Sequence, residues 1–211
     1  MNADEPELQG DEPGSPRAAA GGLGLRDDFI MALRFFSRLP TGGSAHQKPD
    51  LSRIAMALPL ASLAIGIVPA LLLVGGVLGG LPSYFAAALA VGTMILTSGA
   101  MAEDALADAA DGLFGGQTAE RRLEIMKDSR HGTYGVAALA LFIVLRVTAL
   151  GAIAAINPTA AGAIWLAASI VGRSSALWAA VALPPARKDG ASATAGRLPG
   201  RNFAVGTAFA A

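Results

Sequence analysis

The feature that most constrains this chain is a run of 49 residues, from 54 to 102, in which no side chain is charged. A helix needs about 20 apolar residues to cross a bilayer, so this run is long enough to cross twice. The turn-forming sequence GGVLGGLPS at residues 75–83 divides it near its middle. The run therefore predicts two membrane-spanning helices, over 54–78 and 84–112.

A second apolar stretch has the same organisation. Between residues 132 and 186 only Arg146 and Arg173 carry charge, and an Asn-Pro pair at 157–158 breaks the stretch into two. Two further spans are predicted there, over 132–156 and 161–183. The mean hydropathy of +0.51 and the 15% of charged residues lie outside the range of soluble domains. The predicted fold is all-α, a polytopic integral membrane helix bundle with four complete spans.

The two ends of the chain differ from this apolar body. Residues 1–28 hold seven acidic side chains against two arginines, together with several prolines and glycines. This composition predicts a disordered acidic tail ahead of a membrane domain over 29–211. A fifth span is predicted to begin near Asn202, and the FAVGTAFAA that follows is too short to cross a bilayer. We therefore expect the chain to end inside a truncated fifth span.

The segment before the first span, DDFIMALRFFSRLP, carries apolar and basic residues at helical spacing. We expect a short amphipathic helix over 29–39 that lies in the plane of the lipid headgroups. The alternative is a simple extension of the first span, which Pro40 and the Gly42-Gly43 pair oppose. The absence of cysteine excludes disulfides, thiolate metal sites and cysteine nucleophiles.

Basic residues alternate between the loops of the predicted bundle. They gather before the first span, between the second and third, and after the fourth, whereas the turns near 79–83 and 157–160 have none. By the positive-inside rule, the N-terminus and the loops 115–131 and 187–201 face the cytoplasm. This arrangement predicts a multi-pass protein of the cell (inner) membrane whose acidic motif is cytoplasmic.

Acidic residues are concentrated at one place in the body of the chain. Seven of the nine that follow residue 28 lie between 103 and 128. Asp104, Asp108 and Asp111 are spaced i, i+4, i+7, so on a helix their carboxylates share one face, where like charges repel. Oxygen ligands of this kind suit a hard divalent cation, and Mg²⁺ beside a phosphate is the usual arrangement for phosphoryl transfer. The alternative is a solvated helix end that Gly112 caps.

The distance of these acids from the hydrocarbon decides whether they can reach water. A single helix over 84–112 would be about 43 Å long, so its last two turns would leave the membrane core. A carboxylate at the bilayer centre is strongly disfavoured, whereas one at the interface can meet water and metal. The sequence therefore predicts that the carboxylates lie at the cytoplasmic end of one continuous span.

The loop ERRLEIMKDSRHGTYG supplies basic groups next to this cluster. Lys127 and Arg130 flank an Asp-Ser pair and can donate hydrogen bonds to a di- or triphosphate ester. Basic residues of a cytoplasmic loop also serve topology and bind anionic lipid, so both interpretations stay open. His131 could act as a general base at neutral pH, or it could have no catalytic role.

Arg146 and Arg173 lie near the middle of the third and fourth predicted spans. A cation buried in a membrane is disfavoured and normally finds an acid or a ligand. Each arginine is therefore predicted either to pair with an aspartate of the cluster or to bind a phosphate of a substrate.

Two central motifs, DALADAADGLFGG and RRLEIMKDSRHGTYGVAALAL, resemble the signature of the cobalamin synthase (adenosylcobinamide-GDP ribazoletransferase) family. FFSRLP, RIAMALPLASLAIG and GRSSALWAAVALPPARKDG add supporting matches, so the resemblance runs from about Phe29 to the end. The family pattern around the first aspartate is HLDGLADT. Here Ala102, Glu103 and Ala105 stand in place of its histidine, leucine and glycine.

The resemblance implies a magnesium-dependent membrane transferase. Such an enzyme joins α-ribazole or its 5′-phosphate to adenosylcobinamide-GDP, releasing GMP, in the last step of cobalamin biosynthesis. It implies Mg²⁺ as cofactor, held by Asp104, Asp108 and Asp111, one of which can also take the hydroxyl proton of the nucleoside. The implied substrate contacts are Lys127, Asp128, Ser129, Arg130, Thr133, Arg173 and Arg187. The implied partners are these small molecules and membrane lipid, with no nucleic acid.

Other function classes share part of this pattern. CDP-alcohol phosphotransferases of phospholipid synthesis also hold Mg²⁺ with aspartates at a cytoplasmic helix end, and a fold similar to theirs is a second expectation. Their motif has Ala-Arg soon after the Asp-Gly, where this chain has Leu113 and Phe114. A cation transporter would need acids deeper in the membrane, and both embedded charges here are arginines. A purely structural anchor would leave the acidic cluster without a purpose.

Overall fold

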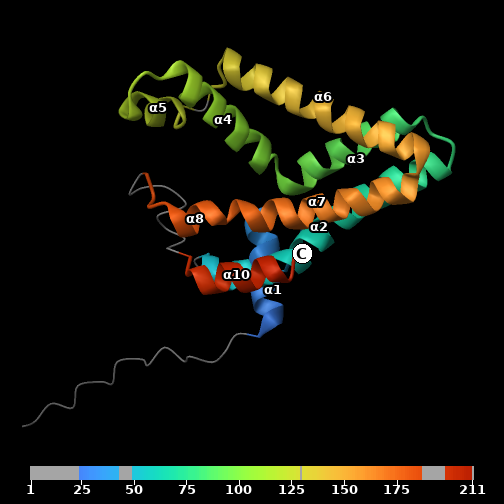
Figure 1. Cartoon of the computed structure of the whole chain (residues 1–211), viewed down its shortest axis with the longest axis horizontal. Helices are drawn as coiled ribbons and strands as arrows, with labels where there is room; N and C mark the ends of the chain where they lie inside the picture. Colours follow the sequence, from blue (N-terminus) through green and yellow to red (C-terminus); the bar gives the residue numbers. More distant parts are fainter. Residues whose placement is uncertain (1–23, 43–48, 129, 187–197, 211) are drawn as a thin grey trace, which may run out of the picture.

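The computed structural model describes residues 24–42, 49–128, 130–186 and 198–210. Every regular element in these ranges is an α-helix (Figure 1), which confirms the predicted all-α class. The helices are α1 (Leu25–Phe36), α2 (Leu51–Leu78), α3 (Ser83–Ser98), α4 (Met101–Gly115), α5 (Ala119–Ile125), α6 (Thr133–Ile156), α7 (Pro158–Ala176), α8 (Trp178–Ala182) and α10 (Gly200–Ala208).

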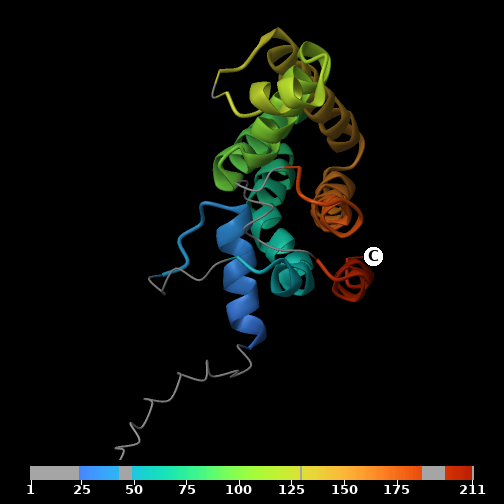
Figure 2. The ribbon, with the colours of Figure 1, turned by 90° about the vertical axis from the view of Figure 1, so that its left-hand side faces the viewer.

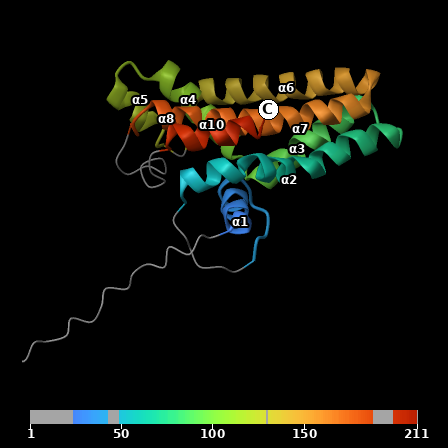
Figure 3. The same cartoon turned by 60° about the horizontal axis from the view of Figure 1, so that its bottom comes forward.

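Three segments are long and apolar enough to cross a membrane: Leu51–Leu78, Thr133–Ile156 and Pro158–Ala182. In Figure 3, α2, α6 and α7 run in roughly the same direction, whereas Figure 1 shows that α6 diverges from α7 on the side of α4. A fourth crossing is counted if α3 and α4 together form one bent span. Large apolar side chains such as Leu71 and Leu141 are exposed on these helices, as lipid contact requires. The structure therefore confirms a multi-pass helix bundle.

The core of the bundle is built around α2, which packs against α1, α3, α7 and α10. Small residues such as Ala57 and Ala61 are fully buried on α2 and let the neighbouring helices approach closely. A Cβ added to Gly162 of α7 would meet the Val74 side chain of α2. The indole of Trp165 donates to the Gly66 carbonyl at 3.1 Å, so a buried polar group is satisfied across the same interface.

The predicted continuous span over 84–112 is wrong in one respect, because the helix breaks between α3 and α4. The two helices meet at an angle of 88° and form a V in Figure 1. Gly99 and Ala100 both adopt left-handed backbone conformations, with φ of 67° and 57°, which end a helix. The Arg38 side chain occupies the place of a Cβ on Gly99, and the Arg38 amide donates to the Thr97 carbonyl at 2.8 Å. The aspartates therefore lie on a helix with its own direction.

The helix α1 runs across α2 rather than along it, and in Figure 3 it is seen end-on below α2. Its buried residues Met31, Ala32 and Leu33 face the core, and Asp28 forms an ion pair with Arg53 at 2.6 Å. The helix predicted over 29–39 therefore exists, with its start and end displaced, and its interfacial placement stays a prediction.

The ends of the chain are described only in part. Residues 1–23 of the predicted tail lie outside the described residues, and its last residues form the start of α1. Near the other end, α10 begins close to the predicted start at Asn202 and packs on the first half of α2, where Gly206 lies against the Ala55 backbone. Helices α1 and α10 lie on opposite sides of α2 (Figure 2).

Candidate functional site

The face of α4 that packs along α6 carries two of the acids. Glu103, Ala107 and Asp111 are spaced i, i+4, i+8 and are 6%, 0% and 7% exposed. At about 100° per residue, this spacing places the three residues on one stripe of the helix. Asp104 and Asp108 lie beside this stripe, nearer to solvent. The acids of α4 therefore divide into two groups with different surroundings.

The Asp111 carboxylate caps the N-terminus of α6. Its Oδ2 accepts the Gly132 amide at 2.6 Å and its Oδ1 accepts the Gly135 amide at 2.9 Å. The first amides of a helix have no partner within it, and the helix dipole favours a negative charge there. Because the N-cap of α6 is a glycine without a capping side chain, the carboxylate of a neighbouring helix supplies the acceptors. A Cβ on Gly132 or Gly135 would collide with that carboxylate, which explains both glycines of the HGTYG segment.

Asp104, Asp108 and His131 form the group that could hold a metal ion. One ligand atom from each lies within 4.8 Å of the others, and His131 Nε2 is 3.8 Å from Asp104 Oδ1. The aspartates are exposed and half-buried, so water can complete a coordination shell. Two carboxylates with an imidazole nitrogen are a donor set that divalent cations accept, and Mg²⁺ uses few protein ligands and keeps several waters.

The predicted aspartate trio is therefore only partly assembled. The structure brings Asp104 and Asp108 together with His131, whereas both oxygens of Asp111 turn to the amides of α6. Each carboxylate oxygen has two lone pairs, so these hydrogen bonds leave acceptor capacity on Asp111. The metal role of the three aspartates stays a prediction. His131, given two interpretations from sequence, is placed beside the carboxylates.

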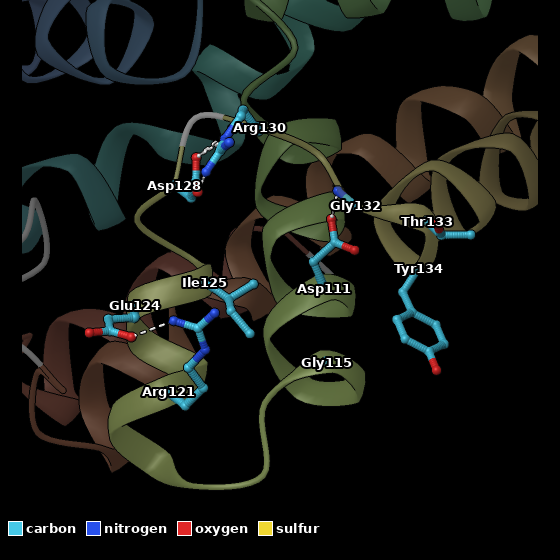
Figure 4. Close-up of a pocket in the computed structure, with 10 residues that line it drawn as sticks. All are labelled: Asp111, Gly115, Arg121, Glu124, Ile125, Asp128, Arg130, Gly132, Thr133 and Tyr134. Carbon is cyan, nitrogen blue, oxygen red and sulfur yellow. Dashed lines mark hydrogen bonds and ion pairs between the residues drawn. The ribbon is translucent and has the colours of Figure 1, made fainter.

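A cavity of about 330 Å³ opens where α4, α5 and the start of α6 meet, and Figure 4 labels the residues that line it. Asp111 lies on one wall, with Thr133 at the start of α6 next to it. Arg121 of α5 also lines the cavity and forms an ion pair with Glu124 at 2.6 Å. The segment 130–132 connects this cavity to the carboxylate group, because its outer residues line the cavity and His131 joins the aspartates.

Asp128 and Arg130 form a second ion pair at the rim of this cavity. The guanidinium donates to Asp128 Oδ1 at 3.1 Å and to Oδ2 at 2.8 Å, and the Arg130 amide also donates to Oδ1. The Arg130 side-chain hydrogen bond, followed by the amide, lowers the pKa of Asp128 from 3.8 to about 2. The Asp128 carboxylate in turn raises the pKa of Arg130 above its ordinary value. Both groups stay charged throughout the neutral range.

The other predicted substrate contacts are distributed unevenly. Thr133, Asp128 and Arg130 line the cavity, and Lys127 precedes them in the same loop. Arg173 lies in α7, where its guanidinium contacts the Met94 sulfur at 3.1 Å and the Ser169 carbonyl at 3.3 Å. Ser129 and Arg187 lie outside the described residues.

Arg146 has an acidic partner, but that partner is Glu103 and not an aspartate. Its guanidinium is 3.2 Å from Glu103 Oε1 and lies over the rings of Phe142 and Trp165, at 5.0 and 5.4 Å from their centroids. The sequence interpretation gave Glu103 no role, because it considered the i, i+4, i+7 face alone. The signal that was available is the i, i+4, i+8 spacing of Glu103, Ala107 and Asp111 on the adjoining stripe.

Comparison with known proteins gives one consistent result. A family model described as Cobalamin-5-phosphate synthase matches residues 28–211. A protein of Azorhizobium caulinodans named adenosylcobinamide-GDP ribazoletransferase is 49% identical over 86% of this chain and 70% of its own length. Proteins of the same name from Bradyrhizobium diazoefficiens and Xanthobacter autotrophicus are 46% and 49% identical, over 85% and 62% of this chain and 70% and 51% of their own lengths. No solved structure matches the chain.

Proposed function

Because the chain belongs to the cobalamin-5-phosphate synthase family, we propose that it is an adenosylcobinamide-GDP ribazoletransferase, as its relatives are named. In this reaction a hydroxyl of α-ribazole, or of its 5′-phosphate, attacks the phosphorus that bears the cobinamide. A new phosphorus–oxygen bond forms, the bond to the GMP oxygen breaks, and the hydroxyl loses its proton. The observation that carries the proposal is a cavity lined by two arginines, Arg121 and Arg130, next to the segment that brings His131 to the carboxylates of Asp104 and Asp108.

The residues around the cavity fit a phosphate ester. Arg121 and Arg130 present guanidinium groups there, and each is held by a neighbouring carboxylate. A guanidinium can donate several hydrogen bonds at once, so each arginine can bind a phosphate oxygen while it keeps its partner. Thr133 adds a hydroxyl on the side of α6. These groups would orient the nucleotide half of the donor.

The carboxylates provide the other half of the site. We propose that Asp104 and Asp108 hold Mg²⁺ with His131 beside them, and that the remaining lone pairs of Asp111 supply a further oxygen ligand. The bound ion would neutralise charge on the phosphate oxygens. Asp104 or Asp108 would also take the hydroxyl proton. Asp111 holds the start of α6, and with it Thr133, against α4.

The membrane setting follows from the spans and the basic loops. We propose that the protein lies in the cell (inner) membrane with its N-terminus and the cavity on the cytoplasmic side, since α5 and the loop after it, which border the cavity, carry Arg121, Arg122 and Lys127. Nucleotide-activated substrates would then reach the cavity from the aqueous phase. Lipid would contact the exposed apolar faces of α2 and α6.

The reaction is tested with purified protein in lipid vesicles, supplied with adenosylcobinamide-GDP, α-ribazole 5′-phosphate and Mg²⁺, by measuring GMP release. Asp104→Ala and Asp108→Ala should lower the rate by about a thousandfold or more, because charge on the phosphate oxygens is no longer neutralised. Glu120→Gln removes an exposed acid of α5 that does not line the cavity, and it should leave the rate unchanged. Normal turnover by both aspartate variants, or preference for CDP-diacylglycerol as donor, would reject the proposal.

A further inference from the structure

Glu103 is a buried acid of α4 that the proposed reaction does not use. Its side chain is 8% exposed, whereas that of Asp104, the next residue, is 65% exposed. Oε1 of Glu103 pairs with Arg146 at 3.2 Å, and Oε2 is buried without a hydrogen-bond partner in the described part of the chain. A carboxylate in such a place is strongly disfavoured unless its cation stays. The pair therefore constrains α4 more than a surface ion pair would.

Helix α4 does not continue in the direction of α3. The left-handed residues Gly99 and Ala100 separate the two helices, which meet at 88°. The orientation of α4 must come from what it packs against, chiefly α5 and α6. Its buried apolar residues on that face are the small Ala107 and Ala110, and the Ala107 backbone lies close to Gly135 of α6. The polar contacts between α4 and α6 therefore act together with this close packing in setting the position of α4.

Two polar contacts fasten α4 to α6 on the same stripe. Asp111 binds the first amides of α6, and Glu103, eight residues earlier, binds Arg146. The contacts are about 12 Å apart along α4. Two attachment points at that separation fix both the rotation of a helix about its axis and its translation along a neighbour, which one point cannot do.

Two aromatic rings also hold the side chain of Arg146 in place. Its guanidinium lies over Phe142 and Trp165, and stacking of this kind orients a guanidinium plane. Trp165 is 3% exposed and donates to the Gly66 carbonyl of α2. Glu103 of α4 is therefore connected to α2, the central helix of the bundle, through Arg146 of α6 and Trp165 of α7.

We infer that the Glu103–Arg146 pair positions the metal-binding carboxylates, with Glu103 acting through Asp104 and Asp108 and not on the substrate. Asp104 and Asp108 lie about 100° and 140° around the helix from Glu103. A rotation of α4 that releases Glu103 would carry both away from His131, whose place is set by the start of α6. The inference rests on the proposed function for its catalytic consequence, but not for its geometry.

The variants are Glu103→Gln, Arg146→Gln and the double variant, with Asp28→Asn as the matched control. Asp28 and Arg53 form an ion pair of comparable closeness between α1 and α2, away from α4. The chain has no cysteine, so Leu113→Cys and Leu141→Cys, both at exposed positions of α4 and α6, allow a spin-label pair to measure the distance between the helices. Mn²⁺ binding by electron paramagnetic resonance reports the carboxylates without substrate.

Each single glutamine variant should broaden the α4–α6 distance distribution, weaken Mn²⁺ binding about tenfold and lower kcat about tenfold, with KM for the cobinamide donor nearly unchanged. The double variant should be no worse than the worse single one, because the two groups act as a unit. Asp28→Asn should reduce thermal stability without changing the distance or the Mn²⁺ affinity. Arg146→Lys keeps the charge but loses the stacked plane, so it should fold and fall between wild type and Arg146→Gln.

The inference is overturned if Glu103→Gln and Arg146→Lys both bind Mn²⁺ and hold the helix distance as the Asp28→Asn control does. It is also overturned if the losses in the double variant simply add. These outcomes differ from failure of the proposed function, in which the wild-type protein releases no GMP from adenosylcobinamide-GDP while the distance and Mn²⁺ measurements still respond to Glu103.

Discussion

The bundle around α2 and the arm formed by α4 and α5 are held together by different interactions. In the bundle, alanines and glycines bring apolar helices into close contact, and Trp165 supplies one buried hydrogen bond. In the arm, carboxylates make the decisive contacts, with Arg146 and with the amides that begin α6. The difference indicates that close packing stabilises the bundle, whereas charged contacts set both the stability of the arm and the geometry of the site. Substitutions in the bundle should therefore lower stability alone, and substitutions in the arm should lower stability and activity together.

Among the substitutions that test this comparison, Asp111→Ala in the arm should have the largest combined effect on stability and turnover. It removes the acceptors of two amides at the start of α6, which should cost about 2–4 kcal/mol of unfolding free energy. The start of α6 carries Thr133 into the cavity, so turnover should fall about a hundredfold as well. Asp111→Asn keeps one acceptor oxygen, so its stability and turnover should lie between those of wild type and Asp111→Ala. GMP release and thermal unfolding in detergent measure both effects, and a normal rate for Asp111→Ala would show that the arm does not depend on this contact.

A smaller effect is expected from Gly135→Ala, because the added methyl group would meet the Asp111 carboxylate and the Ala107 carbonyl. Relieving that clash should cost about 1–3 kcal/mol, and activity should fall by about tenfold as Asp111 is displaced. Gly172→Ala is the control, because a Cβ at that helical position meets nothing within 4 Å. This control should be neutral or stabilise by up to about 1 kcal/mol. Equal behaviour of the two variants in both assays would contradict the tight fit at Gly135.

In the bundle, Gly162→Ala should lower stability and spare the site. Its methyl group would meet Cγ2 of Val74, a stiff β-branched side chain, between α7 and α2. The expected cost is about 1–3 kcal/mol, measured by thermal unfolding. The rate per folded molecule should stay within twofold of wild type, because α4 and α6 keep their contacts. A rate loss that exceeded the loss of folded protein would break the separation between the two regions.

The smallest effect concerns pH. In the folded protein, Arg130 lowers the pKa of Asp128 to about 2. The stabilisation that this carboxylate gives the folded state is therefore fully present above the ordinary pKa of 3.8, and it is lost only as the pH falls toward 2. Between pH 5 and 8 the ion pair at the rim of the cavity should therefore stay constant. The pH profiles of turnover for wild type and Asp128→Asn should have the same shape in that range, even if their heights differ. A wild-type inflection that Asp128→Asn removes would contradict this assignment.

The bundle could be predicted from the sequence far better than the arm. The uncharged run and the Asn-Pro break indicated the spans directly, because hydrophobic length is a local property of the chain. The break at Ala100 is harder to predict, since alanine favours helix; in the structure the Arg38 side chain lies against Gly99 at this break.

The candidate site was predictable in its residue types but not in their directions. The spacing of Asp104 and Asp108 correctly placed them on one face. Asp111 was expected beside them, and its turn toward α6 depends on where that helix begins, which no local pattern states. The sequence likewise could not show which of several acids pairs with Arg146, because the packing of α4 on α6 decides this.

Because of the right-angled break at Gly99 and Ala100, the orientation of α4 should not depend on the number of residues in α3. In an unbroken helix, inserting one residue turns every later side chain by about 100°. Here we expect an insertion or deletion within α3 to be absorbed at the break, because the contacts of α4 with α5 and α6 set the orientation of the carboxylates. We therefore expect α3, the helix before the break, to tolerate changes in length while the carboxylates beyond it stay aligned.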